Sequence, residues 1–113
     1  MLPDRRLNGQ VRVELLYFDG CPCFERLLPH VRELLREAGV EEALELRRVE
    51  SPEQAAAERF LGSPSVRVDG VDVEPGADAR TDFGLSCRLY GDEEHVPRSE
   101  WIVAAVERAL VPD

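Results

Sequence analysis

The stretch that decides the fold is Asp19-Gly20-Cys21-Pro22-Cys23-Phe24, which joins an apolar run to a helical pattern. Residues 11–18 before it are expected to form a β-strand, and their nearly continuous apolar second half is typical of a central strand buried on both faces. A helix is expected from Phe24, so Cys21 stands at the start of its first turn. Free N–H groups and the positive end of the helix dipole stabilise a thiolate there, and we expect Cys21 to be reactive.

One face of the expected helix over residues 24–38 is apolar. Its members are Phe24, Leu27, Leu28, Val31, Leu34, Leu35 and Ala38. Gly39 is expected to end the helix in the left-handed conformation. Pro29 lies inside the pattern, where it removes one backbone hydrogen bond and is expected to kink the axis at a cost of about 3 kcal/mol.

A second strand is expected over residues 43–49, where leucines alternate with charged residues. A short helix is expected over residues 52–61. Ser51 is its predicted N-cap, Gln54 closes a predicted capping box, and Gly62 is the predicted stop.

A third strand is expected over residues 65–68, and Asp69-Gly70 after it favours a type I′ hairpin turn. Two segments are candidates for its principal partner, residues 71–73 and residues 85–90, and the sequence leaves this choice open. Ser99 is expected to cap a last helix. The resulting order, β-α-β-α-β-β-α, predicts an α/β domain whose central mixed sheet carries helices on both faces.

The composition fits a single soluble domain. The chain has 113 residues, with 43% hydrophobic and 33% charged side chains, which suits one hydrophobic core. We expect residues 1–10 to be a flexible lead and residues 11–113 to form the domain. The net charge is −9 and every basic side chain is an arginine, spread along the chain without a basic block. Nucleic acid is therefore not an expected partner.

The sequence contains no apolar run of membrane-spanning length and no signal-peptide pattern, so we expect a cytoplasmic protein with no membrane partner. Three cysteines, an odd number, favour redox or metal chemistry over structural disulfides. No cofactor is expected.

These residues resemble the thioredoxin fold. A cysteine ends the first strand, a helix with an internal proline follows it, and Gly62-Ser63-Pro64-Ser65 leads into a later strand. The resemblance covers residues 11–110 and implies a three-layer sandwich. It also implies that Pro64 is cis and packs beside the reactive cysteine. Ser63 and Pro64 are then expected to position a partner by strand-like pairing along a free main-chain edge.

The resemblance also implies roles for two of the cysteines. In thioredoxins the helix proline lies eight residues beyond the attacking cysteine, and Pro29 lies eight residues beyond Cys21. Cys21 thus matches the attacking thiol. The position of the resolving thiol falls on Phe24, and Cys23 lies one residue before it. Two cysteines separated by one proline can close only a strained ring, which favours easy reduction.

Three segments more closely resemble small bacterial thioredoxin-like proteins, some of which are labelled alkylmercury lyase-like. They are residues 17–22, residues 62–70 with Pro64, and residues 84–90 with Cys87. Lyase chemistry in that family uses two cysteines and an aspartate. Cys21 and Cys87 match the two thiols. Phe24 occupies the position of the aspartate in the family's Cys-x-x-Asp motif. Asp19 is the acidic residue nearby in the sequence.

The leading hypothesis is a thiol protein in which the Cys21 thiolate attacks a disulfide or another soft electrophile, a mercurial included. Cys23 or Cys87 supplies the second thiol. The interpretation of Cys87 that requires no chemistry is that of a core cysteine on a strand. Two alternatives remain open: a soft-metal module that holds mercury, copper or zinc through Cys21, Cys23 and Cys87, and a thioredoxin scaffold that binds a partner without thiol chemistry. The sequence does not predict the oligomeric state.

Overall fold

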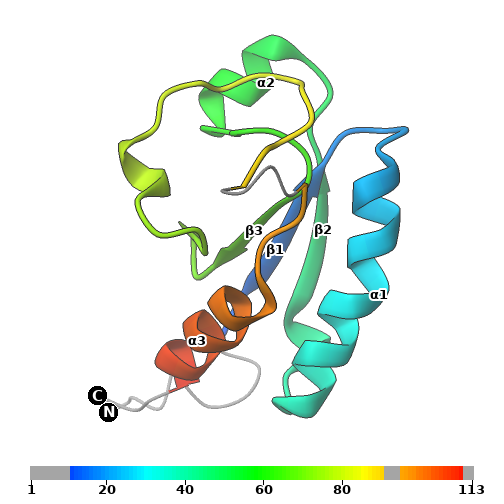
Figure 1. Cartoon of the computed structure of the whole chain (residues 1–113), viewed down its shortest axis with the longest axis vertical. Helices are drawn as coiled ribbons and strands as arrows, with labels where there is room; N and C mark the ends of the chain where they lie inside the picture. Colours follow the sequence, from blue (N-terminus) through cyan, green and yellow to red (C-terminus); the bar gives the residue numbers. More distant parts are fainter. Residues whose placement is uncertain (1–10, 91–94, 111–113) are drawn as a thin grey trace.

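The computed structural model describes residues 11–90 and 95–110. Its centre is a four-stranded mixed sheet in the order β2-β1-β3-β4. In that sheet, β1 (Val13–Tyr17) pairs in parallel with β2 (Leu44–Arg48) and antiparallel with β3 (Ser65–Val68). The last strand, β4 (Val71–Asp72), pairs antiparallel with β3. The central position predicted for the first strand is therefore confirmed (Figure 1).

Different helices cover the two faces of the sheet. The larger core cluster joins β1 and β3 to α1 (Pro22–Glu37) and α3 (Ser99–Leu110), and the smaller one joins β1 to α2 (Pro52–Ala57). Alternation along β1 explains this division, because Val13 and Leu15 belong to the first cluster and Leu16 to the second. The prediction of a mixed sheet between helices is confirmed (Figure 1).

The first helix follows the sequence pattern closely. It begins at Pro22, two residues before the apolar stripe, because Cys21 is its N-cap and proline suits the first helical position. It continues through Pro29 to Glu37. Gly39 then takes a φ of +80°, the left-handed conformation predicted for it.

The second helix is shorter than predicted. It ends at Ala57, and Arg59 takes the left-handed position with a φ of +56°. The next N–H, that of Phe60, donates to the carbonyl of Ala55 at 2.8 Å, which closes the helix end. Fully buried Phe60 belongs to the smaller core cluster, and its burial explains why a non-glycine residue accepts this conformation. Gly62 is thus not the helix stop.

The start of this helix matches the prediction in part. The hydroxyl of Ser51 accepts a hydrogen bond from the N–H of Gln54 at 3.0 Å, as expected of an N-cap. The side chain of Gln54 does not reach back to Ser51. Its oxygen accepts from the N–H of Glu50 at 2.8 Å, one residue earlier.

The structure settles which segment pairs with the third strand. That partner is β4, and Asp69 and Gly70 between the strands have φ values of +52° and +85°, as a type I′ turn requires. Residues 85–90 form no strand. An isolated parallel bridge joins Cys87 of this segment to Ser63.

A buried carboxylate lies in the middle of the sheet, on the strand face opposite the larger core. Glu14 of β1 is 2% exposed and accepts hydrogen bonds from Arg12 at 2.7 Å and Arg47 at 3.0 Å. Burial raises the pKa of this carboxyl, but the bonds and charges of the two guanidinium groups outweigh burial and hold the pKa below its ordinary value. Sequence periodicity predicts the strand but not this charge cluster within it.

Two short 3₁₀ helices complete the described part of the chain. The first, η1 (Glu41–Ala43), leads into β2, and the second, η2 (Ala77–Ala79), lies in the connection after β4. Among the described residues, no helix combines the length and the apolar character that crossing a membrane requires. The expected flexible lead, residues 1–10, lies outside the described residues.

Candidate thiol site at the start of α1

The sulfur of Cys21 caps α1. It accepts a hydrogen bond from the N–H of Phe24 at 3.4 Å, and the residue has the extended φ and ψ of an N-cap. This contact is the one expected from a cysteine at a strand-to-helix junction, because a thiolate there takes up one of the free N–H groups of the first turn. Cys21 is only 1% exposed, however, so a bulky reagent does not reach it directly.

Cys23 is the more accessible cysteine of the pair. It is partly buried, and a guanidinium nitrogen of Arg26 donates to its sulfur at 3.4 Å. Both sulfurs are free thiols in the structure. The first turn of α1 therefore holds one capped, buried thiol and one accessible thiol beside a cation.

Phe24, at the position of a resolving cysteine, has a packing role instead. Its ring stacks on Tyr17 with centroids 3.9 Å apart and the planes 5° from parallel. The stack joins the end of β1 to the first turn of α1, which holds the junction around Cys21 in place.

Asp19 is directed to the surface. Its side chain is 75% exposed and accepts a hydrogen bond from Arg48, at the end of β2, at 3.0 Å. In this arrangement the carboxylate pairs with a guanidinium rather than with a cysteine.

The Ser63–Pro64 turn does lie beside the end of β1. The Ser63–Pro64 peptide bond is cis, as the resemblance implies, and the hydroxyl of Ser63 accepts from the N–H of Phe18 at 3.4 Å. The expectation of a free main-chain edge here is wrong. The N–H of Ser63 donates to the carbonyl of Ser86 at 2.9 Å, and its carbonyl accepts from the N–H of Arg88 at 3.0 Å. The protein's own segment fills the edge expected for a partner.

Cys87 lies on that segment and is exposed, so the interpretation as a core cysteine is wrong. Residues 85–90 direct Arg88 and Tyr90 inward, while Cys87 and Leu89 are exposed. The Tyr90 hydroxyl donates to the carbonyl of Pro64 at 2.6 Å, and its ring lies 4.4 Å from the Arg88 guanidinium. The segment is therefore anchored by an arginine and a tyrosine rather than by its leucines.

Arg88 is the main feature that the sequence interpretation missed. Its side chain is 0% exposed and donates to both carboxylate oxygens of Asp72, at 2.6 and 3.0 Å, to Glu74 at 2.7 Å and to the hydroxyl of Ser65 at 2.7 Å. Burial lowers the pKa of this guanidinium, but Asp72, Tyr90 and Glu74 outweigh it and hold the pKa above its ordinary value. A signal was present in the sequence, because Arg88 and Tyr90 are two residues apart and share a face of an extended segment.

The three cysteines do not gather into one metal site. Within residues 11–90 and 95–110, no three histidine, cysteine, aspartate or glutamate side chains lie close enough together to hold a metal ion. All three cysteines belong to this part of the chain. A metal site built from all three is thus not formed in this structure.

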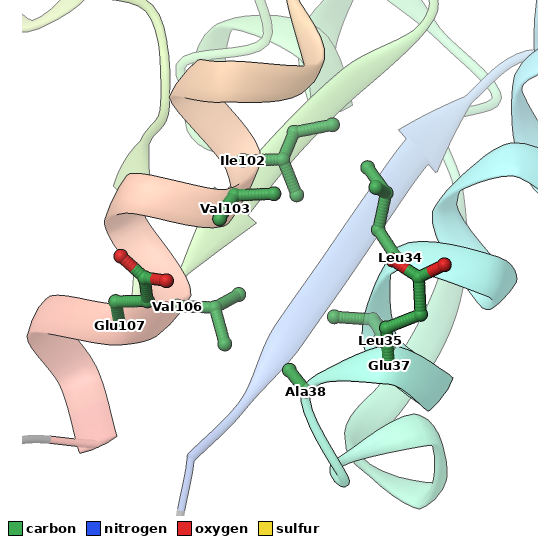
Figure 2. Close-up of a pocket in the computed structure, with 8 residues that line it drawn as sticks. All are labelled: Leu34, Leu35, Glu37, Ala38, Ile102, Val103, Val106 and Glu107. Atoms are coloured by element: carbon green, nitrogen blue, oxygen red, sulfur yellow. The ribbon is translucent and has the colours of Figure 1, made fainter.

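An apolar hollow of about 200 Å³ lies between α1 and α3, far from the thiols along α1 (Figure 2). Leu34, Leu35 and Ala38 approach it from the end of α1, and Ile102 and Val106 approach it from α3. Glu37 and Glu107 also line it, and no cysteine does, so the first turn of α1 remains the candidate site for thiol chemistry.

Comparison with protein-family models, with curated proteins and with solved structures gives no match for this chain. The fold and the contacts of the site are therefore the basis for a functional proposal.

Proposed function

We propose that this chain is a thioredoxin-like domain that carries out thiol–disulfide exchange at the first turn of α1. The proposal is supported by the strand order β2-β1-β3-β4, by the placement of α1 and α3 on one face of the sheet and α2 on the other, and by a cysteine after the end of β1. The observation that carries it is the hydrogen bond from the N–H of Phe24 to the sulfur of Cys21. It supports the proposal because a free N–H group of the helix N-terminus is directed at the sulfur that closes the disulfide in the second step of the exchange.

Burial argues for an order of events within the pair. The resemblance to thioredoxins matches Cys21 to the thiol that attacks first, but that residue is 1% exposed, whereas Cys23 is partly exposed beside Arg26. We therefore assign the first encounter with substrate to Cys23. Its thiolate attacks one sulfur of a substrate disulfide, forms a mixed disulfide and releases the other sulfur as a thiolate.

Cys21 then completes the exchange. Its thiolate attacks the sulfur of Cys23, forms the Cys21–Cys23 disulfide and releases the second substrate thiolate. The two cysteines lose two electrons and two protons, and the substrate disulfide takes them up to become two thiols. The reverse sequence oxidises a dithiol.

The occupied main chain of Ser63 favours small substrates. Both of its groups bond residues 86–88, so an extended peptide cannot pair there while that segment is in place. A small disulfide needs no such edge. Mercurials and peroxides are alternative soft electrophiles for the same thiols.

Trapping experiments test the proposal. In a Cys87→Ser background, the reduced protein is mixed with glutathione disulfide and followed by mass spectrometry. We expect the Cys21→Ser variant to retain one glutathionyl group on Cys23, and the unmodified pair to lose two hydrogens as its disulfide closes. Retention of the adduct by Cys23→Ser alone would reverse the order. Reaction no faster than that of the urea-unfolded protein would refute the thiol function.

A further inference from the structure

A second cavity, of about 630 Å³, lies beside the β3–β4 hairpin. The end of α2, the turn around η2 and the last turn of α3 also border it, and none of the three cysteines lines it. Its volume falls within the range of about 300 to 1,000 Å³ that is usual for small-molecule sites. The chemistry of its wall is therefore independent of the thiols.

Arg67 is the central cation of this wall. It is partly buried, and one of its nitrogens donates to the main-chain carbonyls of Glu58 at 2.5 Å and Arg59 at 3.0 Å. Carbonyl oxygens carry no net charge, and in the described part of the chain no carboxylate forms an ion pair with Arg67. A partly buried guanidinium without a counter-ion is costly, and burial indeed lowers its pKa below the ordinary value.

The two acidic residues opposite Arg67 in the sheet accept hydrogen bonds from other arginines. Asp72 faces it from β4, but both oxygens of Asp72 accept from Arg88. Glu14 faces it from β1, but that carboxylate accepts from Arg12 and Arg47. The charge of Arg67 therefore remains available to a ligand.

Two further arginines border the cavity, and neither forms an ion pair with another described residue. Arg59 holds its guanidinium 5.0 Å from the centre of the Phe83 ring, and Arg108 is exposed at the end of α3. This is notable in a chain whose net charge is −9. Three arginines that form no ion pair within the described part of the chain thus line one cavity.

The carboxylates of the wall are hydrogen-bonded to other arginines, and the nearby charges of Asp72 and Glu58 offset only part of the effect of burial on the pKa of Arg67. Glu58 bonds Arg47 at 2.7 Å, and Glu74 bonds Arg88 at 2.7 Å and Arg80 at 3.0 Å. With Asp72 also paired, only exposed Asp78 among the lining acids lacks a described partner. Apolar side chains of Leu61, Val71 and Val73 complete the wall beside Phe83.

We propose that this cavity binds a small organic anion whose carboxylate or phosphate group pairs with Arg67 and whose apolar body lies against Phe83. A guanidinium offers paired N–H donors that match the oxygens of either group. The flanking charges of Arg59 and Arg108 attract the anion, and the apolar wall favours an aromatic or aliphatic body over an inorganic ion.

Titrations with three probes test this site. Phenyl phosphate and benzoate supply the two anionic groups on an aromatic body, and benzyl alcohol supplies the body without the charge. Two-dimensional NMR monitors the binding. We expect saturable binding of at least one anion, with chemical-shift changes at Phe83 and at the Arg67 side chain. Benzyl alcohol should bind much more weakly. Inorganic phosphate should bind more weakly than phenyl phosphate.

Single variants assign the binding to this cavity. Arg67→Gln is expected to reduce affinity about tenfold or more, since a charge-assisted contact is lost. Arg108→Gln, an exposed substitution that leaves the fold intact, should weaken binding by a smaller factor. Arg32→Gln, on the exposed face of α1, is the matched control and should bind as the wild type does. Equal affinity of all three variants, or no saturable binding of either anion, would overturn the proposal.

Discussion

Ser63 and Cys87 pair in a parallel β-bridge, with the main chain of Ser63 bonded on both sides to residues 86–88. The bridge fills the edge beside Pro64 and fixes Cys87 at the surface. Gly62 makes the pairing possible. Its φ is +125°, and a Cβ there would lie 2.9 Å from the carbonyl oxygen of Ser86 and 3.0 Å from the Cβ of Arg88.

Replacing Gly62 by alanine is expected to destabilise the domain by about 2 to 4 kcal/mol, because backbone strain and a steric clash combine. Urea unfolding at neutral pH measures the change. Gly39→Ala is the matched control, since Gly39 has a φ of +80° and a Cβ there would meet nothing within 4 Å. It introduces a side chain at a positive φ without a clash and should cost about 1 kcal/mol. Equal losses in the two variants would contradict the close packing of residues 86–88.

The buried Arg88 network leads to a second prediction. Arg88→Met would leave the carboxylates of Asp72 and Glu74 without their main donor, and we expect a loss of about 3 to 5 kcal/mol in unfolding free energy. Arg48→Met removes an arginine that is 47% exposed and pairs with Asp19, and it should cost less than about 1 kcal/mol. Thermal and urea unfolding compare the two. A small effect at Arg88 would mean that residues 86–90 are not anchored by this side chain.

Local signals were enough to predict most of the fold. The apolar run of β1, the helical stripe of α1 and the Asp69-Gly70 turn each depend on neighbouring residues, and each forms as expected. Residues 85–90 do not form the strand considered for them, because their inward contacts are made by Arg88 with acids from β4 and the loop after it. A buried ion network depends on distant partners, so periodicity does not reveal it.

The candidate site was predictable to the same degree. A cysteine between a strand and a helix predicts an N-cap, and Cys21 is one. Its 1% exposure depends on how the rest of the domain packs over the junction. The pairing of the Ser63 main chain with residues 86–88 likewise depends on a segment distant in the sequence. The sequence therefore predicted the place of Cys21 at the helix start, but not that its sulfur is buried or that Cys87 is exposed.

Acid should destabilise the domain through Glu14. The pKa of this carboxyl is below its ordinary value in the folded protein, so its contribution is present above the unfolded pKa of about 4.5 and is lost as pH falls through the lower, folded value. Urea unfolding between about pH 7 and pH 3 measures the loss. For Glu14→Gln, the deficit relative to wild type should be large near neutrality and should shrink in acid. A deficit that is constant across this range would refute the charged pairing with Arg12 and Arg47.

Alkylation should distinguish the three cysteines by their exposure. With iodoacetamide at neutral pH, we expect exposed Cys87 and partly exposed Cys23 to react well before Cys21, which is 1% exposed. Modification of Cys21 requires local opening of the helix start, so its rate should rise with moderate urea while the rate at Cys87 stays nearly constant. Peptide mass spectrometry of a time course gives the three rates. In fully unfolding urea the rates should converge, which controls for intrinsic reactivity, and rapid labelling of Cys21 in the native protein would instead return the first attack on substrate to that residue.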